Sequence, residues 1–346
     1  MLNLYLDPFV FVCPNPADGA GEFDCYIDTL VLLEDIRQSD WIHVYMMAST
    51  NEVLLSTDSY PMWDSLEKAI AYHNASEIQT RDVMTVINSL LQRVPQIEDA
   101  FQISEILVEE IQYQPNYHVQ NRATPFIEHY LRILSLACLI CEINGMDQRE
   151  QVFITKSLRG ATEQLIIHGK LVAHEPNRLA LHIDLPHMFG GSFSGIVDRH
   201  GLFLCVDPIL LWLNAHCPEC YRQAISIYLF KRLLERGISA LMAAPPWTVG
   251  LNFFASIDAL SILRQENRIK ELLRACVESI LSENLSATHA LRIGAGPNEP
   301  QRIRRRDGAK AFRRDINYDY HLHYWETSAG PEFAAVVTHN DMTIPE

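Results

Sequence analysis

Apolar residues recur at helical spacing in several long segments of the chain. Within residues 22–40, Tyr26, Leu30 and Leu33 lie three or four positions apart, which predicts a helix with one buried face. Gly145, Gly169 and Gly237 each follow such a segment and predict where a helix ends. Similar patterns predict further helices over 62–74, 81–94, 127–144, 147–168, 222–237 and 256–284.

Shorter apolar runs with turn residues at their ends predict β-strands. The runs fall at 2–16, 41–49, 52–57 and 178–186. Near the C-terminus, residues 320–338 predict a hairpin whose turn contains "ETSAGP". On its first strand, alternation places Tyr320, Leu322 and Tyr324 on one face and His321, His323 and Trp325 on the other.

These elements predict a mixed α/β (α+β) fold. Residues 113–126 lack periodicity and contain two prolines, so they are interpreted as a linker. The expected parts are an acidic N-terminal α/β domain (1–112), this linker, a mainly helical domain with short strands (127–290) and a small basic and aromatic C-terminal β element (291–346).

The charge of the chain is unevenly distributed. Net charge is −15, and residues 1–120 hold 19 Asp and Glu against 4 Lys and Arg. This part should repel nucleic acid and anionic membranes. With 48% hydrophobic residues, no basic leader and no uninterrupted apolar run of about 20 residues, the sequence predicts a globular cytoplasmic protein that does not enter a membrane.

The segment "RIRRRDGAKAFRR", residues 302–314, is the most basic part of the chain. Arginine side chains suit phosphate groups, and the neighbouring aromatic residues can stack on bases. A competing interpretation is that the segment docks on the acidic N-terminal domain. The candidate nucleic-acid-binding residues are Arg302, Arg304, Arg305, Arg306, Lys310, Arg313 and Arg314.

Three imidazoles in the hairpin are candidate acid/base groups, namely His321, His323 and His339. About 45 residues of the chain resemble the C-terminal half of RelE/ParE-type toxins. The matching segments are "AFRRDI", "YHLHYW", "EFAAVV" and "THND". The resemblance implies an Arg-rich strand, an aromatic strand and an RNA-cleaving histidine. Where ribosome-dependent members have an arginine and a terminal tyrosine, this chain has Asn340 and Ile344.

The eight cysteines are expected to be free thiols, and no metal or cofactor is predicted. Two pairs have C-x-x-C spacing, Cys138/Cys141 and Cys217/Cys220. Four thiolates would suit zinc, but the first pair lies in an apolar helix where thiols simply pack. The segment "HCPECY" is the better candidate of the two for metal or redox chemistry.

Together these features favour an accessory or effector protein of a prokaryotic toxin or antiphage-defence (antiviral) system. On this hypothesis it belongs to a protein complex and contacts nucleic acid through residues 302–325. One alternative is a non-enzymatic scaffold that joins protein partners. Another is a carboxylate-metal nuclease that uses Asp7, Asp58 and Asp82 of the N-terminal domain. The sequence does not decide whether the protein is a catalyst.

Overall fold

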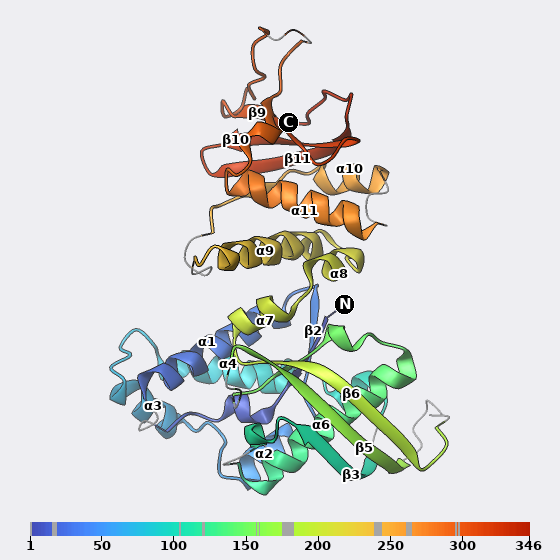
Figure 1. The fold of residues 1–346 in the computed structure, drawn as a ribbon. Helices are drawn as coiled ribbons and strands as arrows, with labels where there is room; N and C mark the ends of the chain where they lie inside the picture. Colours follow the sequence, from blue (N-terminus) through green and yellow to red (C-terminus); the bar gives the residue numbers. More distant parts are fainter. Residues whose placement is uncertain are drawn as a thin grey trace. The chain divides into compact units, whose positions relative to one another are not determined.

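The chain forms two compact units in the computed structural model, Met1–Val206 and Asp207–Glu346. Each contains one β-sheet with helices packed on it, so the mixed α/β class is confirmed (Figure 1). The structure describes residues 2–15, 19–103, 105–119, 122–156, 158, 160–174, 183–238, 244–260, 265–294, 296 and 298–346.

The N-terminal unit is built on a mixed six-stranded sheet. Its strand order is β2-β1-β4-β6-β5-β3. The pairs β1–β2, β1–β4 and β4–β6 are parallel, whereas β5 is antiparallel to both of its neighbours. Both β1 and β4 are buried along their whole length, as is usual for parallel strands covered on both faces. The strands are β1 (Leu2–Leu6), β2 (Ile42–Tyr45), β3 (Ile106–Gln114), β4 (Gln151–Ile154), β5 (Thr162–His174) and β6 (His187–Ile196).

Helix α6 (Thr124–Asn144) forms the main core of this unit. Its Ile133 and Ile140 lie in one buried cluster with Phe153 of β4 and Phe193 of β6. The helix ends at Gly145, which has a φ of 62° and forms the left-handed C-cap that the sequence predicts. The other helices are α1 (Ala20–Arg37), α2 (Thr50–Ser56), α3 (Trp63–Tyr72), α4 (Thr80–Arg93), α5 (Ile97–Phe101) and α7 (Arg199–Cys205), with 3-10 turns η1 (Pro8–Phe11), η3 (Asn116–Val119) and η4 (Gln148–Glu150).

The C-terminal unit has a five-stranded sheet with helices on one face. The strand order is β7-β11-β10-β9-β8. Helices α10 and α11 pack on the sheet, and α9 packs on α11 (Figure 1). The elements are α8 (Pro208–Leu213), α9 (Pro218–Glu235), β7 (Thr248–Val249), α10 (Phe253–Ala259), α11 (Glu266–Ile280), η6 (Leu285–Ala287), β8 (Thr288–Ala290), β9 (Lys310–Asp315), β10 (Tyr320–Thr327) and β11 (Gly330–Thr338).

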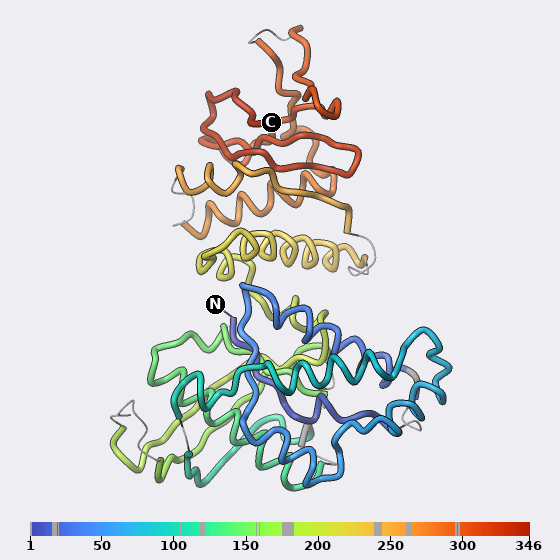
Figure 2. The backbone as a smooth tube through the Cα atoms, turned by 180° about the vertical axis from the view of Figure 1, so that it is seen from behind, coloured from blue at the N-terminus to red at the C-terminus, as the bar shows by residue number. Residues whose placement is uncertain are grey.

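The boundary between the two units lies after Val206, whereas the sequence predicted a linker at 113–126. Strand β1 lies between β2 and β4, so the first strand needs residues 151–154 as a partner. Strand β1, dark blue near the N-terminus in Figure 2, pairs in parallel with this later segment. The expected linker contributes the end of β3 and the start of α6. A two-stranded ribbon is only marginally stable alone, so the acidic segment 1–112 completes its sheet with later strands.

Other predicted elements also differ from the structure. The run 2–16 forms β1 only as far as Leu6 and continues as η1. The run 52–57 belongs to helix α2, and the predicted helix 147–168 is replaced by η4, β4 and most of β5. In β5 buried and more exposed residues alternate, which is a strand pattern where the sequence predicted a helix. The predicted helix 256–284 corresponds to α10, which already begins at Phe253, and to α11, which begins at Glu266. Ser256 therefore lies inside α10, where its hydroxyl accepts a hydrogen bond from Val336 N. Most of the predicted strand 178–186 lies outside the described residues.

A buried ion pair joins the predicted N-terminal domain to the predicted linker. Arg122 Nη1 lies 2.6 Å from Asp7 Oδ2, its Nη2 donates to Thr155 Oγ1 at 2.7 Å, and the side chains of Arg122 and Asp7 are fully buried. Replacing Arg122 with methionine leaves the carboxylate without its charge partner. We expect a loss of about 3–5 kcal/mol in the free energy of unfolding, measured by urea denaturation.

Arg149→Met is the matched control for this prediction. Arg149 pairs with Asp147 at 2.6 Å, but 75% of its side chain is exposed. An exposed pair contributes about 1 kcal/mol or less. Equal effects of the two substitutions would contradict the structural role assigned to Arg122.

Candidate functional site

The sheet of the C-terminal unit carries charged and titratable residues on one face. The strand register pairs His321 with Asp315, and pairs Arg313 with both His323 and His289. Directly opposed residues of antiparallel strands point to the same side of a sheet. These five residues therefore share one face, called here the polar face. The prediction that His321 and His323 share a face is confirmed.

The opposite face packs on helix α11. Leu322 is buried there, and Phe312 stacks on Tyr324 with ring centroids 5.7 Å apart. Arg314 pairs with Leu322 in the register and so also points to this side. The alternation along β9 thus sends Arg313 and Arg314 to opposite faces.

A chain of imidazoles and one carboxylate crosses the polar face. His321 Nε2 lies 2.8 Å from His339 Nδ1, so the prediction that His339 joins this group is confirmed. His321 Nδ1 lies 3.1 Å from Asp315 Oδ1, without the alignment of a hydrogen bond. His289 Nε2 is 3.6 Å from the other oxygen of the same carboxylate. Burial lowers the pKa of His321 to about 4 although Asp315 opposes the shift, so His321 is neutral at pH 7.

His323 is covered by the last residues of the chain. Its side chain is buried, and its Nδ1 donates to the carbonyl of Thr343 at 2.7 Å. Trp325 Nε1 likewise donates to the carbonyl of Pro345 at 2.7 Å. Burial lowers the pKa of His323 as well. Of the three catalytic candidates, only His339 is exposed to solvent.

Two of the predicted nucleic-acid contacts are structural residues instead. Arg304 is only 1% exposed, and its guanidinium binds Asp307 and Glu332 at 2.6 Å each. It also lies 5.2 Å from the ring centroid of Trp325. Hydrogen bonds to these carboxylates raise the pKa of Arg304 above its ordinary value, so the guanidinium stays charged. The two carboxylates already balance that charge. The prediction that Arg304 contacts nucleic acid is therefore wrong. A run of arginines in a sequence does not show which of their side chains turn inward.

Arg314 is the second such residue. It is also 1% exposed and pairs with Glu278 of α11. Its other Nη atom donates to Thr288 Oγ1 at 3.0 Å, and further bonds reach the carbonyls of Glu283 and Asn284. These contacts tie β9 to α11 and to the start of β8. They occupy both Nη atoms, and Nε is buried, so this guanidinium does not face a ligand.

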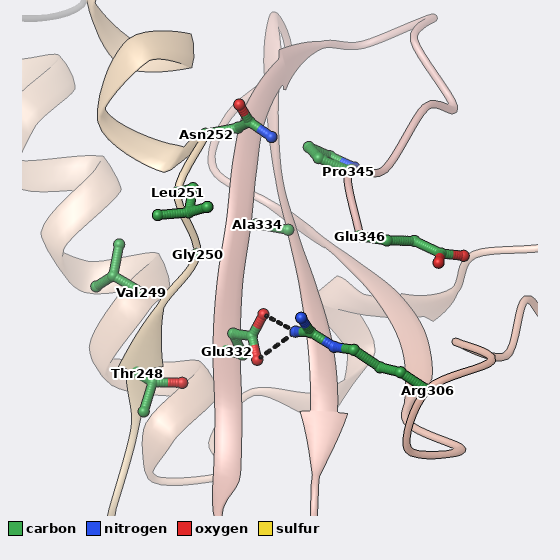
Figure 3. A pocket seen from close by; sticks show the side chains of 10 residues that line it. All are labelled: Thr248, Val249, Gly250, Leu251, Asn252, Arg306, Glu332, Ala334, Pro345 and Glu346. Carbon is green, nitrogen blue, oxygen red and sulfur yellow. Dashed lines mark hydrogen bonds and ion pairs between the residues drawn. The ribbon is translucent and has the colours of Figure 1, made fainter.

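Arg306 lines a hollow of ≈ 360 Å³ beside β7 and β11 (Figure 3). Its Nη2 lies 3.2 Å from Glu332 Oε1, and Glu346 also lines the hollow. Carboxylates thus balance the charge, and an anion would not be favoured here. Arg305 and Lys310 are exposed, and neither forms an ion pair with the described residues.

A larger hollow of ≈ 670 Å³ opens at β8, β9 and the loop that joins them. We name it the arginine hollow because three arginines line it, together with one histidine: Arg292, Arg302, Arg313 and His289. No carboxylate is among the described residues that line it. The remaining lining residues are Thr288, Ala290, Leu291, Ile293, Gly294, Gly296 and Met342.

The arginines of this hollow bond to neutral groups. Arg302 Nε donates to the carbonyl of Arg292 at 2.9 Å, and Arg292 Nη1 donates to the carbonyl of Glu299. Arg313 Nη1 lies 3.7 Å from Met342 Sδ. None of the three pairs with a carboxylate among the described residues, so their charge is available to an anion. Sequence reasoning found Arg302 and Arg313, but missed Arg292 and His289 because these lie upstream of the basic segment.

The acidic residues of the alternative nuclease site lie apart. Asp7 is buried against Arg122 and Thr155. Asp58 follows the end of α2, and Asp82 lies in the first turn of α4. No cluster of potential metal ligands among the described residues includes any of the three aspartates. The structure therefore does not assemble the carboxylate-metal site.

Comparisons of the chain with protein-family models, curated proteins and solved structures find no significant match. Within the described part of the chain, no helix combines the length and the apolar character needed to cross a membrane.

Because the pKa of His321 is low in the folded protein, the free energy of unfolding should depend on pH. The unfolded histidine takes up a proton near pH 6.5, whereas the folded one does so only near pH 4. The free energy of unfolding should therefore fall as the pH is lowered between these values, by up to about 1.4 kcal/mol per pH unit for this group. His321→Gln should flatten this dependence in urea unfolding. His168→Gln, at an exposed position of β5, is the control and should leave it unchanged. An unaltered pH dependence in His321→Gln would contradict the assignment.

Proposed function

We propose that the C-terminal unit binds nucleic acid through the arginine hollow. The observation that carries the proposal is the lining itself, with three arginines and a histidine and no carboxylate among its described residues. Guanidinium groups that lack a carboxylate partner suit phosphate oxygens. A volume of ≈ 670 Å³ is in the range of nucleotide-sized ligand sites.

Two exposed cations that follow Arg302 in the sequence support a polymer as the ligand. Arg305 and Lys310 belong to the loop and the strand that follow Arg302. A single phosphate would occupy the hollow alone, whereas a nucleic-acid backbone carries further phosphates that such residues can meet. The carboxylate partners of Arg304, Arg306 and Arg314 all belong to the same unit. These three cations are therefore neutralised without the acidic N-terminal segment, which weakens the docking interpretation.

The wider proposal is that the protein acts as an accessory or effector protein of a prokaryotic toxin or antiphage-defence system. Its support is the resemblance of the hairpin and its basic lead-in to RelE/ParE-type toxins, together with the proposed nucleic-acid site. On this proposal the acidic N-terminal unit repels nucleic acid and is available to protein partners.

Binding should depend on Arg302 and Arg313. With a labelled single-stranded RNA and DNA of mixed sequence, fluorescence polarisation should show affinity falling as the salt concentration rises from about 50 to about 300 mM. The double substitution Arg302→Gln, Arg313→Gln should weaken binding and reduce the salt slope by about one for each phosphate that is no longer neutralised. Arg149→Gln removes an exposed arginine of the other unit and should change neither. An unchanged slope in the double variant, or no binding by the parent protein at the lowest salt concentration, would contradict the proposal and favour the scaffold.

We further expect binding without cleavage. His321 is neutral and buried, and His323 is hydrogen-bonded and covered, so neither is positioned to exchange protons with a bound RNA. End-labelled RNA incubated with the parent protein should remain intact on a denaturing gel. Cleavage by the parent that is abolished in His339→Ala, with RNA binding retained, would instead identify a nuclease centre at His339.

A further inference from the structure

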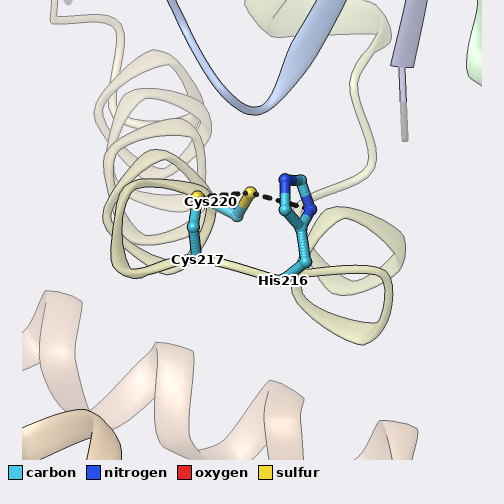
Figure 4. A group of neighbouring side chains, drawn as sticks. All are labelled: His216, Cys217 and Cys220. Carbon is cyan, nitrogen blue, oxygen red and sulfur yellow. Dashed lines mark hydrogen bonds between the residues drawn. The ribbon is translucent and has the colours of Figure 1, made fainter.

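Three potential metal ligands converge where helix α9 begins. Cys217 is the N-cap of α9, with Pro218 in the first helical position. An N-cap side chain turns toward the residue three positions later, which here is Cys220. The two sulfur atoms lie 3.2 Å apart, and Cys220 Sγ lies 3.7 Å from Nδ1 of His216. Figure 4 shows the three side chains directed toward one another.

The distances resemble one face of a tetrahedral zinc site. Zinc bonds of about 2.3 Å to sulfur and about 2.0 Å to nitrogen at tetrahedral angles place two sulfurs about 3.8 Å apart, and sulfur and nitrogen about 3.6 Å apart. The observed separations are 3.2 and 3.7 Å, and the three ligand atoms all lie within 4.8 Å of one another. Small rotations of side chains are therefore enough to accommodate the ion.

We propose that His216, Cys217 and Cys220 bind a zinc ion. Two thiolates and an imidazole select zinc over magnesium or calcium, which require oxygen ligands. Cys220 is buried, whereas His216 is exposed, so the fourth coordination position faces the solvent side and can hold water. The ion joins the turn after α8 to the first turn of α9, two helices that pack on each other. The ion thus cross-links these two helices, and its ligands are distinct from the residues of the arginine hollow.

This cluster differs from the second C-x-x-C pair. Cys138 and Cys141 lie within α6, and burial raises the pKa of each thiol to about 12. Neither belongs to the ligand cluster. The spacing alone is therefore no sign of a site. What distinguishes the proposed site is the combination of an N-cap position with an adjacent histidine.

The metal content of the full chain tests the proposal. The protein is stripped with a chelator under reducing conditions, exchanged into buffer without nucleic acid and reconstituted with zinc. We expect about one zinc per chain by elemental analysis, as a single tetrahedral site requires. Cobalt in place of zinc should give the thiolate charge-transfer and strong ligand-field absorption of a tetrahedral site, and added zinc should remove it.

Substitutions separate this site from adventitious binding. Cys217→Ser and His216→Asn, at positions outside the core, should each lose most of the bound metal and the cobalt spectrum. Cys205→Ser removes a partly buried thiol outside the cluster and should retain both. Zinc affinity should fall as the pH is lowered, because protons compete with the ion for the two thiolates and the imidazole.

Three outcomes would overturn the proposal. In the first, the reconstituted parent protein holds no more zinc than Cys217→Ser. In the second, zinc persists in both ligand variants. In the third, Cys217 and Cys220 form a disulfide and the reduced protein still fails to bind zinc. The last would identify a redox pair instead. Because no nucleic acid is present in these measurements, their failure leaves the proposed function untouched.

Discussion

A guanidinium removed from water must find carboxylates and carbonyls, and Arg314 imposes this requirement on the C-terminal unit. Its pairing with Glu278 fixes β9 against α11, and its bond to Thr288 fixes the start of β8. Since successive residues of a strand point to opposite sides, the burial of Arg314 directs Arg313 to the polar face. One buried ion pair thus places the neighbouring arginine where a ligand can reach it.

The sequence predicted the elements whose pattern is local and long. The helices around α1, α4, α6 and α9 and the C-terminal hairpin all lie where their periodicity placed them. The prediction of a helix over 147–168 was wrong because the apolar residues there also fit a helix, and only pairing with β1 and β6 makes this region sheet. The domain boundary was misplaced for the same reason. Strand partners distant in sequence leave no local signal.

The site was predicted only in part, for a related reason. A basic run reveals that charge is concentrated but not how each side chain is paired. Arg302 and Arg313 have no carboxylate partner among the described residues, while Arg304 and Arg314 are each held by acids from other segments. His289 could have been found only by recognising β8, which is three residues long, and Arg292 lies in the loop beyond its end. The predicted metal ligands of the N-terminal domain were wrong for another reason. Asp7 neutralises a buried arginine and is therefore not a metal ligand.

The cover over His323 and Trp325 is made by main-chain carbonyls of Thr343 and Pro345, not by their side chains. Any residue supplies a carbonyl, so the amino-acid identities at these two positions can drift while the cover persists. The path of the backbone is what matters. In related chains, selection at positions 343 and 345 would therefore act on the path of the backbone, whereas at position 344 it would also act on the side chain, because Ile344 packs against the cluster that contains Trp325.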